Sequence, residues 1–374
     1  QHIARMKKAD WTDPSAPTFT GEIAQGDGAV LDALTSYYEA LFGKKTTKPE
    51  SVEKCLATLK DPNSKRVLAP TASACDADIT EEEMSDTLGE LPLGKSPGPD
   101  RLPTKFYKTF SQLLAPILTR VFNEARRRGE LPPTCTEGLI SVLYKKKDQE
   151  DPRNYRPITL LNNDYKILTR ILTKRMNVAV MQFVSPQQNG FVPGGFLPEN
   201  IMLLKLIQAV VEEEDSDAWF VYLDMEKAFD RSAWDYLIDA MEALGFNSEA
   251  SLERDAPGDQ SAPLSPDAKP KGFVDFVKLF YSHDHPPTRK LSMNGRLGKK
   301  FPLASGVAQG CPLSPLLFLC ITEALTRLIV NDKRTEGVTI NDTQHKISQY
   351  ADDSTLAGRT QDDWDCYEEH INTW

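Results

Sequence analysis

Hydrophobic residues recur at helical spacing in several separate stretches of the chain. In residues 199–213 four apolar residues share one stripe, which is typical of a helix packed on a core. These are Ile201, Leu204, Ile207 and Val211. Thr80 with Glu83 three positions later is a capping-box pattern and predicts a helix start. Helices are predicted near 29–42, 80–93, 104–128, 164–183, 199–213, 232–245, 273–281 and 313–330.

Shorter apolar runs predict strands, and turn residues separate them. Residues 138–148 predict a strand that ends in a basic tip, and residues 219–223 predict a buried strand. The dipeptide Asn294-Gly295 predicts a hairpin turn. Residues 346–350 and 354–358 predict two further strands, with the two acids of "QYADDS" at the turn between them.

In two stretches the hydrophobic residues show neither helical nor strand-like spacing. Residues 61–77 are expected to be a linker, and residues 247–271, rich in Pro, Ser and Asp, are expected to be an exposed insertion. No apolar run approaches the roughly 18 residues of a membrane span, and no apolar leader follows Gln1. Because the chain begins with Gln rather than Met, we expect a fragment of a longer polypeptide. The six cysteines form no C-x-x-C pair, which favours reduced thiols over a zinc site.

Charge is distributed unevenly along the chain. The net charge is −10, which by itself argues against nucleic-acid binding. Residues 101–210, however, hold 17 Lys and Arg against 8 Asp and Glu, a local charge of +9, and the remainder carries −19. The pattern is compatible with one phosphate-binding face on an acidic body, and equally with ordinary variation in surface charge.

Acidic residues lie at the ends of two predicted strands far apart in the sequence. Asp224 ends the strand at 219–223, and Asp352 and Asp353 follow the strand at 346–350. An Asp-Asp turn is unremarkable by itself, but adjacent strands of one sheet could bring these acids together. Clustered carboxylates repel one another unless a cation lies between them, and Mg²⁺ prefers carboxylate oxygens. Two such ions about 4 Å apart can support an in-line phosphoryl displacement.

A glycine-containing loop precedes the long apolar helix at 313–330. Gly306, Gln309 and Gly310 would give a small loop that allows close backbone approach, and the start of the helix would favour an anion. An ordinary helix start with Pro312 in its first turn accounts for the same residues.

Six motifs in order resemble the reverse transcriptase domain of non-LTR (LINE-type) retrotransposons. They cover about residues 78–374. In order they are "GKSPGPDRLPTKFYK", "LISVLYKKKDQEDPRNYRPITLLNNDYKIL", "QQNGFVPGGF" with "PENI", "FVYLDMEKAFD", "ASGVAQGCPLSPLLF" and "QYADDS". The resemblance implies an α+β right-hand polymerase fold with fingers and a palm, the palm an antiparallel sheet backed by helices. It divides the chain into an N-terminal extension at 1–77, fingers at 78–213 and a palm at 214–374 that stops before the thumb.

The resemblance also implies an RNA-directed DNA polymerase. This nucleotidyltransferase would join a dNTP to the 3′-hydroxyl of a DNA primer on an RNA template, using Mg²⁺ or Mn²⁺. Catalytic acids would be Asp224, Asp352 and Asp353. Metal ligands would be Asp224, Asp352 and the carbonyl of Met225. It implies no membrane partner, an intracellular and nuclear location, and nothing about oligomeric state.

Substrate-binding residues follow from the same motifs. Phe229 would be the aromatic gate that excludes a ribose 2′-hydroxyl, and Gln309 and Gly310 would contact the nucleotide. Arg156, Lys145 and Lys147 would contact the triphosphate, for which Arg is suited by its bidentate geometry. Each of these residues has an alternative role. Phe229 could be a core residue, and Arg156 could be a surface salt-bridge partner. The lysines could form a solvated hairpin tip.

This sequence departs from the family pattern at two motif positions. Gly194-Gly195 stands where the family usually has Gly-Arg, which removes a basic group. Arg101 stands where Gly is usual after "PGPD", which matters if that residue has a positive φ.

Three other functions remain open at this point. The chain could be a decayed retroelement copy, although its motif acids, Phe229 and Gln309 are intact. It could be a non-catalytic RNA-binding scaffold, although unmetallated acids would repel phosphate. It could also be a phosphohydrolase or nuclease with related two-metal chemistry, although Phe229 and the glycine loop favour a polymerase.

Overall fold

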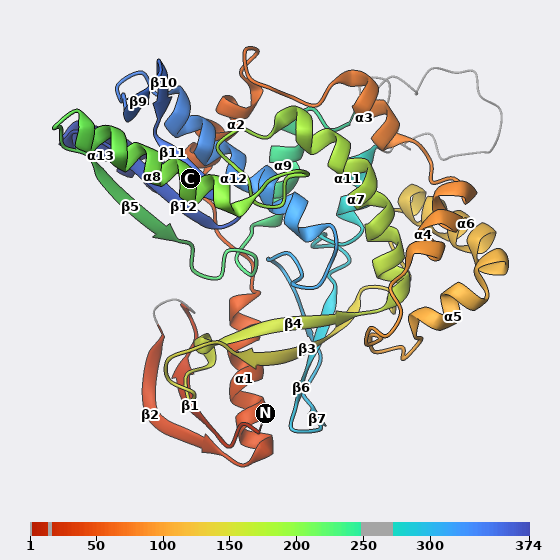
Figure 1. Ribbon diagram of the computed structural model, residues 1–374. Helices are drawn as coiled ribbons and strands as arrows, with labels where there is room; N and C mark the ends of the chain where they lie inside the picture. The colour runs from red at the N-terminus through yellow and green to blue at the C-terminus, as the bar shows by residue number, and fades with distance from the viewer. Residues whose placement is uncertain (1, 14–16, 248–271) are drawn as a thin grey trace.

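The computed structural model describes residues 2–13, 17–247 and 272–374 as a mixed α and β structure (Figure 1). The predicted insertion at 247–271 lies outside the described residues except for Asn247. Most of the buried side chains form one large hydrophobic core that runs from Ile3 to Ala324. The N-terminal residues therefore pack into the same core as the rest of the chain.

The helices confirm most of the predicted positions. They are α1 (Asp27–Leu41), α2 (Pro49–Lys60), α3 (Ala69–Asp76), α4 (Glu81–Glu90), α5 (Thr104–Thr109), α6 (Ser111–Arg128), α7 (Asn163–Phe183), α8 (Leu197–Glu213), α9 (Trp234–Ala243), α11 (Phe273–Lys278), α12 (Ser314–Asn331) and α13 (Gln361–Thr373), with a short 3-10 turn, η1 (Pro152–Asn154). The expected capping box opens α4, where the Thr80 hydroxyl and the Glu83 carboxylate each accept from the other residue's backbone N–H.

Several helix predictions were wrong in detail. Residues 61–77 are not only a linker, because α3 lies within them and its end is held by Arg175 of α7, which donates to the carbonyls of Cys75 and Ala77. The helix predicted at 104–128 breaks at Phe110 into α5 and α6. Of the α8 stripe only Ile207 is fully buried, and Ile201 is 50% exposed. α2 and α13 were not predicted.

Within the described part of the chain the strands form four sheets. They are β1 (Arg5–Asp10), β2 (Thr18–Gln25), β3 (Glu137–Tyr144), β4 (Tyr155–Leu161), β5 (Trp219–Asp224), β6 (Thr288–Met293), β7 (Arg296–Leu297), β8 (Phe301–Pro302), β9 (Val338–Ile340), β10 (Thr343–His345), β11 (Ile347–Tyr350) and β12 (Asp353–Gly358). β1 pairs with β2 and β9 with β10. A five-stranded sheet has the order β4-β3-β6-β7 with β8 on β6, and a three-stranded sheet has the order β11-β12-β5.

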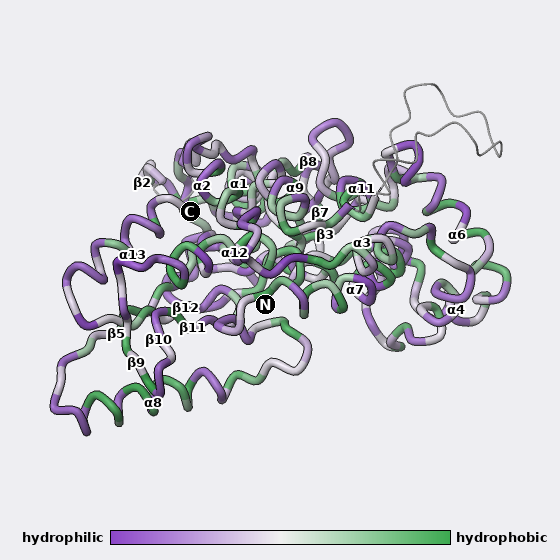
Figure 2. The backbone as a smooth tube through the Cα atoms, turned by 90° about the horizontal axis from the view of Figure 1, so that it is seen from above, coloured by the Kyte–Doolittle hydropathy of each residue, from purple (hydrophilic) through white to green (hydrophobic). Residues whose placement is uncertain are grey.

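The three-stranded sheet is antiparallel and covered by helices on both faces. Trp219, Val221 and Leu223 of β5 pack with Leu325 of α12 and Tyr367 of α13. The opposite face packs against Ile207 of α8 through Phe220 and Ala357. β5 is less buried than predicted, and Tyr222 is 69% exposed. Figure 2 shows α8 along the margin of the molecule, with hydrophobic residues along its length.

The hairpin turn and the long apolar helix were predicted correctly. Asn294 and Gly295 connect β6 to β7 with φ values of 49° and 77°, as a two-residue turn with two left-handed residues requires. By length and composition α12 could cross a membrane, but 78% of it is buried inside the molecule, which accounts for its apolar residues as those of a core helix. All six cysteines are free thiols.

Candidate active site

Pairing between β5 and β12 brings the two acidic motifs together. In this antiparallel pair Asp353 lies directly opposite Asp224, and Asp352 occupies the turn one residue earlier. The prediction that adjacent strands join these motifs is therefore confirmed. Residues opposite each other in an antiparallel pair have Cβ atoms about 5 Å apart, so the carboxylates share one end of the sheet.

The surroundings of Asp352 disfavour its negative charge. The pKa of this carboxyl is raised above its ordinary value, first by burial and then by the nearby charges of Asp353 and Asp224, while Lys145 lowers it. Among the described residues no group of three or more His, Cys, Asp or Glu side chains is arranged to hold a metal ion. A metal here would therefore have two carboxylates, a backbone carbonyl and ligands from substrate or water. Mg²⁺ commonly binds in this way.

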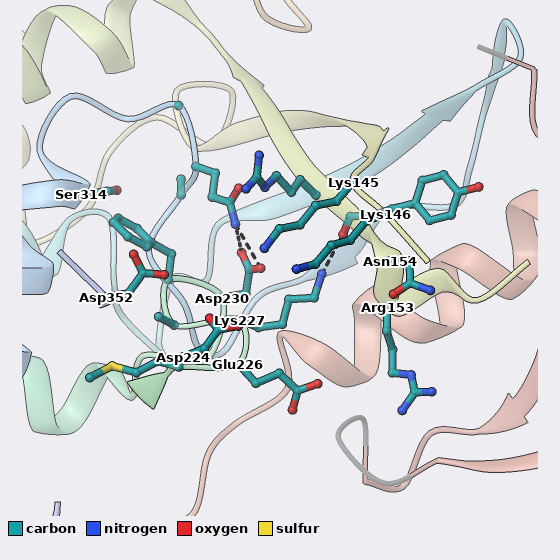
Figure 3. A pocket seen from close by; sticks show the side chains of 18 of the residues that line it. Lys145, Lys146, Arg153, Asn154, Asp224, Glu226, Lys227, Asp230, Ser314 and Asp352 are labelled. Atoms are coloured by element: carbon teal, nitrogen blue, oxygen red, sulfur yellow. Dashed lines mark hydrogen bonds between the residues drawn. The ribbon is translucent and has the colours of Figure 1, made fainter. Parts of the chain in front are cut away.

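A pocket of about 720 Å³ opens beside the acids. Nine of the ten predicted site residues line it, the exception being Asp353. Asp224 and Asp352 lie on one side, and Lys145 and Lys146 reach in from the other (Figure 3). The structure thus brings together residues from the β3–β4 loop, β4, β5, the β11–β12 turn and the loop before α12, and these segments are far apart in the sequence.

The basic side of the pocket lies at the tip of the β3–β4 hairpin. Lys145, Lys146, Lys147 and Arg156 are exposed at or beside this tip, and within the described residues none of their charged side-chain groups makes a hydrogen bond or ion pair. The nearby acids have partners of their own, because Arg153 pairs with Asp151 and Lys7 pairs with Asp148 at 2.6 Å. Unpaired cations that face a pocket are suited to bind phosphate groups.

Phe229 lies at the pocket wall with its ring fixed by other aromatic residues. It stacks on Phe318 of α12 with a centroid distance of 4.8 Å, and Phe191 meets it edge-on at 5.9 Å. The ring is only partly buried. One face of Phe229 therefore packs in the core, which agrees with the alternative that it is a core residue. The residue also borders the pocket.

The glycine loop packs closely on the segment after β5. Val307 N–H donates to the carbonyl of Phe229 at 2.7 Å, and Gly306 N–H donates to that of Ser232 at 2.8 Å. Gly306 has φ of 84°, and a Cβ there would meet the Asp230 carbonyl oxygen at 2.7 Å. This position therefore requires glycine for its conformation and for the close approach.

Gln309 is oriented by a buried carboxylate. Its Nε2 donates to both oxygens of Asp230, at 2.9 and 3.1 Å. Burial raises the pKa of Asp230 to about 7, opposed by the charge of Lys227 and by the hydrogen bond from Gln309. The Gln309 carbonyl accepts from Thr159 of β4 at 2.9 Å, so the loop is also tied to the basic hairpin.

The two departures from the motif pattern have local structural consequences. Arg101 has φ of 62°, so this position has the left-handed conformation that glycine adopts most easily. A Cβ at Gly195 would meet the Asn189 carbonyl oxygen at 2.1 Å. The loop in this chain could not accept an arginine at 195 without shifting.

Sequence reasoning missed several residues that shape the site. Asp230 and Lys227 lie in the quoted motif "FVYLDMEKAFD" but received no role, although Lys227 Nζ donates to the Tyr155 carbonyl at 2.7 Å. Gln188 and Phe191 lie in "QQNGF" and contact the acidic turn and Phe229. Their positions in motifs were the available signal, but their partners depend on tertiary structure.

Comparison with known proteins identifies the part of the chain that contains the pocket residues. Residues 144–374 match the family described as reverse transcriptase (RNA-dependent DNA polymerase). A Transposon TX1 uncharacterized 149 kDa protein from Xenopus laevis is 29% identical over 88% of this chain and 23% of its own length. A retrovirus-related Pol polyprotein from the type-2 retrotransposable element R2DM of Drosophila melanogaster is 25% identical over 76% of this chain and 23% of its own.

A further relative is the RNA-directed DNA polymerase from mobile element jockey of Drosophila melanogaster. It is 25% identical over 76% of this chain and 28% of its own length. The chain thus spans about a quarter of the length of these relatives.

Proposed function

The chain belongs to the reverse transcriptase family and is related to proteins of non-LTR retrotransposons, and from this premise we propose that it copies RNA into DNA. The observation that carries the proposal is the β5–β12 register, which places Asp224 beside the acidic turn at a pocket with unpaired cations opposite. In this proposal the three-stranded sheet with its helices is the palm, and the β3–β4 hairpin belongs to the fingers.

The site residues fit a divalent metal. Asp224 and Asp352 offer hard oxygen donors, and Met225 lines the same pocket. The pKa of Asp352 is raised first by burial and then by the charges of Asp353 and Asp224. Mg²⁺ bound there would lower the pKa of the primer 3′-hydroxyl and stabilise charge on the transferred phosphoryl group. Asp353 lies on the paired strand outside the pocket and would influence the site through its charge.

The remaining pocket residues would hold the nucleotide. Arg156, Lys145 and Lys147 would bind the triphosphate oxygens, opposite the acids. Phe229 would contact the sugar and leave no room for a 2′-hydroxyl, because stacking on Phe318 prevents its ring from moving aside. Gln309, with its amide nitrogen held by Asp230, would present its Oε1 to the nucleotide, together with the Gly310 backbone, which lies close to Thr159 of β4.

Primer extension tests this proposal. The wild-type chain is incubated with a DNA primer annealed to an RNA template, dNTPs and Mg²⁺ or Mn²⁺, beside Asp352→Asn and a reaction with rNTPs. We expect metal-dependent extension with dNTPs, much weaker extension with rNTPs, and no extension by Asp352→Asn. Shortening of the primer or template without extension would instead favour a nuclease. RNA binding without metal-dependent chemistry would favour the scaffold alternative.

A further inference from the structure

The acidic turn contains a residue in an unfavourable conformation. Ala351, immediately before Asp352, has φ of 60° and is buried. Residues with a Cβ seldom adopt left-handed backbone angles, and such conformations persist only where surrounding structure holds them. Some contact outside the turn must therefore hold Ala351 in place.

One side chain satisfies both backbone polar groups of Ala351. Gln188 Oε1 accepts from Ala351 N–H at 2.8 Å, and Gln188 Nε2 donates to the Ala351 carbonyl at 3.1 Å. The same Oε1 also accepts from Gly190 N–H at 2.8 Å. Gln188 is 3% exposed, so water cannot readily replace these bonds. The primary amide thus fixes the orientation of both peptide units that flank Ala351, directly before Asp352.

Backbone contacts hold the Gln188 segment independently of its side chain. Asn189 N–H donates to the Gln349 carbonyl at 3.0 Å, and Gln349 N–H donates to the Gln187 carbonyl at 2.8 Å. Asn200 of α8 donates to the Gln349 carbonyl at 2.9 Å. Gly190 packs so tightly that a Cβ there would lie 2.0 Å from the Ala351 nitrogen. Replacement of the Gln188 side chain should therefore leave the segment docked.

We propose that Gln188 is a positioning residue for catalysis, which holds the Ala351 peptide so that Asp352 is directed into the pocket. This inference rests on the proposed function, because it concerns the geometry of the acid that would bind the metal. Gln188 does not line the pocket, so it acts through the turn and not on substrate. Displacement of a reacting group by about 1 Å can cost about 100-fold in rate.

The test compares two glutamines with similar contacts. Gln188→Met keeps the side-chain length and removes the amide hydrogen bonds. Gln182→Met is the matched control, because the Gln182 amide also accepts from a backbone N–H, that of Leu68 at 2.8 Å, and donates to Thr71 at 2.7 Å, away from the acidic turn. Both variants are compared with wild type in hydrogen exchange of the peptide covering 347–354 and in Mn²⁺ binding by electron paramagnetic resonance.

The proposal predicts faster exchange in that peptide and at least about tenfold weaker Mn²⁺ binding for Gln188→Met, with Gln182→Met behaving as wild type. Adding Ala351→Gly to Gln188→Met should restore part of the binding, because glycine adopts the left-handed angle without a Cβ. Unchanged exchange and binding in Gln188→Met, or equal losses in both single variants, would overturn the proposal.

Primer extension separates this inference from the proposed function. We expect Gln188→Met to lose kcat at least about tenfold with little change in KM for the dNTP, since the nucleotide contacts stay in place. A wild-type kcat in Gln188→Met would overturn the positioning role while leaving the polymerase proposal intact. An inactive wild type would refute the proposed function, and the exchange and Mn²⁺ measurements would still decide whether Gln188 holds the turn.

Discussion

The two sides of the pocket are built in different ways. The acidic side stands on a three-stranded sheet, where the β5–β12 register fixes Asp224 opposite Asp353 and Gln188 holds the adjacent turn. The basic side stands on a hairpin tip, where Lys145, Lys147 and Arg156 are exposed. Under the proposed function the acids would need a fixed geometry, whereas the cations would supply charge to a flexible triphosphate and would tolerate more freedom.

The largest effect should come from the acidic side. Asp224→Asn removes one of two carboxylates that would hold the metal, and we expect kcat to fall by at least about 1,000-fold. Asp353→Asn is the matched control, because Asp353 pairs with Asp224 but does not line the pocket. Single-nucleotide incorporation measures both. Equal losses in the two variants would contradict the distinction drawn between these acids.

The basic side should respond through binding. Arg156→Ala should raise KM for dNTP by roughly 10- to 100-fold, the value of about one or two hydrogen bonds between charged groups, with a smaller change in kcat. Lys147→Ala should cost less, because a single lysine at a tip with three is more easily replaced. The pair is compared by steady-state kinetics at two salt concentrations. A kcat effect from Arg156→Ala as large as that of Asp224→Asn would show that the basic side also needs fixed geometry.

Phe229 lies between the two sides and should affect selectivity. Phe229→Ala should raise the efficiency with rNTP relative to dNTP by roughly 10- to 100-fold, because the space for a 2′-hydroxyl opens. Phe318→Leu removes the stacking partner and keeps the gate residue, so it should change the ratio in the same direction but less than Phe229→Ala. Parallel kcat/KM measurements with each nucleotide test this. If Phe229→Ala left the ratio of kcat/KM for rNTP to that for dNTP unchanged, the Phe229 ring would be a core residue and not a gate.

Asp230 gives a pH-dependent prediction on the acidic side. Its pKa is about 7 in the folded protein because of burial, above the ordinary value of 3.8. Below pH 3.8 the Asp230 carboxyl is protonated in both the folded and the unfolded state. As the pH rises from 3.8 towards 7, the carboxyl ionises first in the unfolded state, so the free energy of unfolding of the wild type falls. Asp230→Asn should therefore gain stability over wild type between pH 4 and 8, by roughly 4 kcal/mol at most. Urea unfolding at several pH values measures this, and a constant difference across that range would contradict it.

The smallest effect concerns the backbone at the start of the basic region. Arg101→Gly should stabilise the protein by about 1 kcal/mol, because φ of 62° is unfavourable for a residue with a Cβ. Thermal unfolding measures this change, with Arg101→Ala as the control that keeps the Cβ and removes the charge. If Arg101→Ala stabilised the protein as much as Arg101→Gly, the effect would come from removal of the charge and not from relief of the left-handed backbone conformation.

Sequence patterns predicted much of this site because its residues lie in short motifs at strand and helix ends. Asp224 and Asp352 could be placed at strand ends from alternating and apolar runs, and Asn294-Gly295 encodes its turn locally. The N-terminal hairpin β1–β2 could not be predicted, because its strands are polar and exposed over much of their length. The domain boundaries at residues 77 and 213 stay predictions.

Contacts between distant segments could not be read from the sequence. Nothing local to Gln188 indicates that its amide meets Ala351, 163 residues away. The raised pKa of Asp230 likewise depends on burial beneath a loop 79 residues further on. Such partners become visible only when the chain is folded, and they are the residues that sequence reasoning left without a role.

The most direct test of the account is Mn²⁺ binding at the paired strands, measured by electron paramagnetic resonance with and without a dNTP. The account predicts that the wild-type chain binds Mn²⁺, that the dNTP strengthens this binding, and that Asp224→Asn and Asp352→Asn each abolish it while Asp353→Asn keeps most of it. Binding that is unaffected by Asp224→Asn and Asp352→Asn would contradict the claim that the β5–β12 register builds a metal-dependent polymerase site.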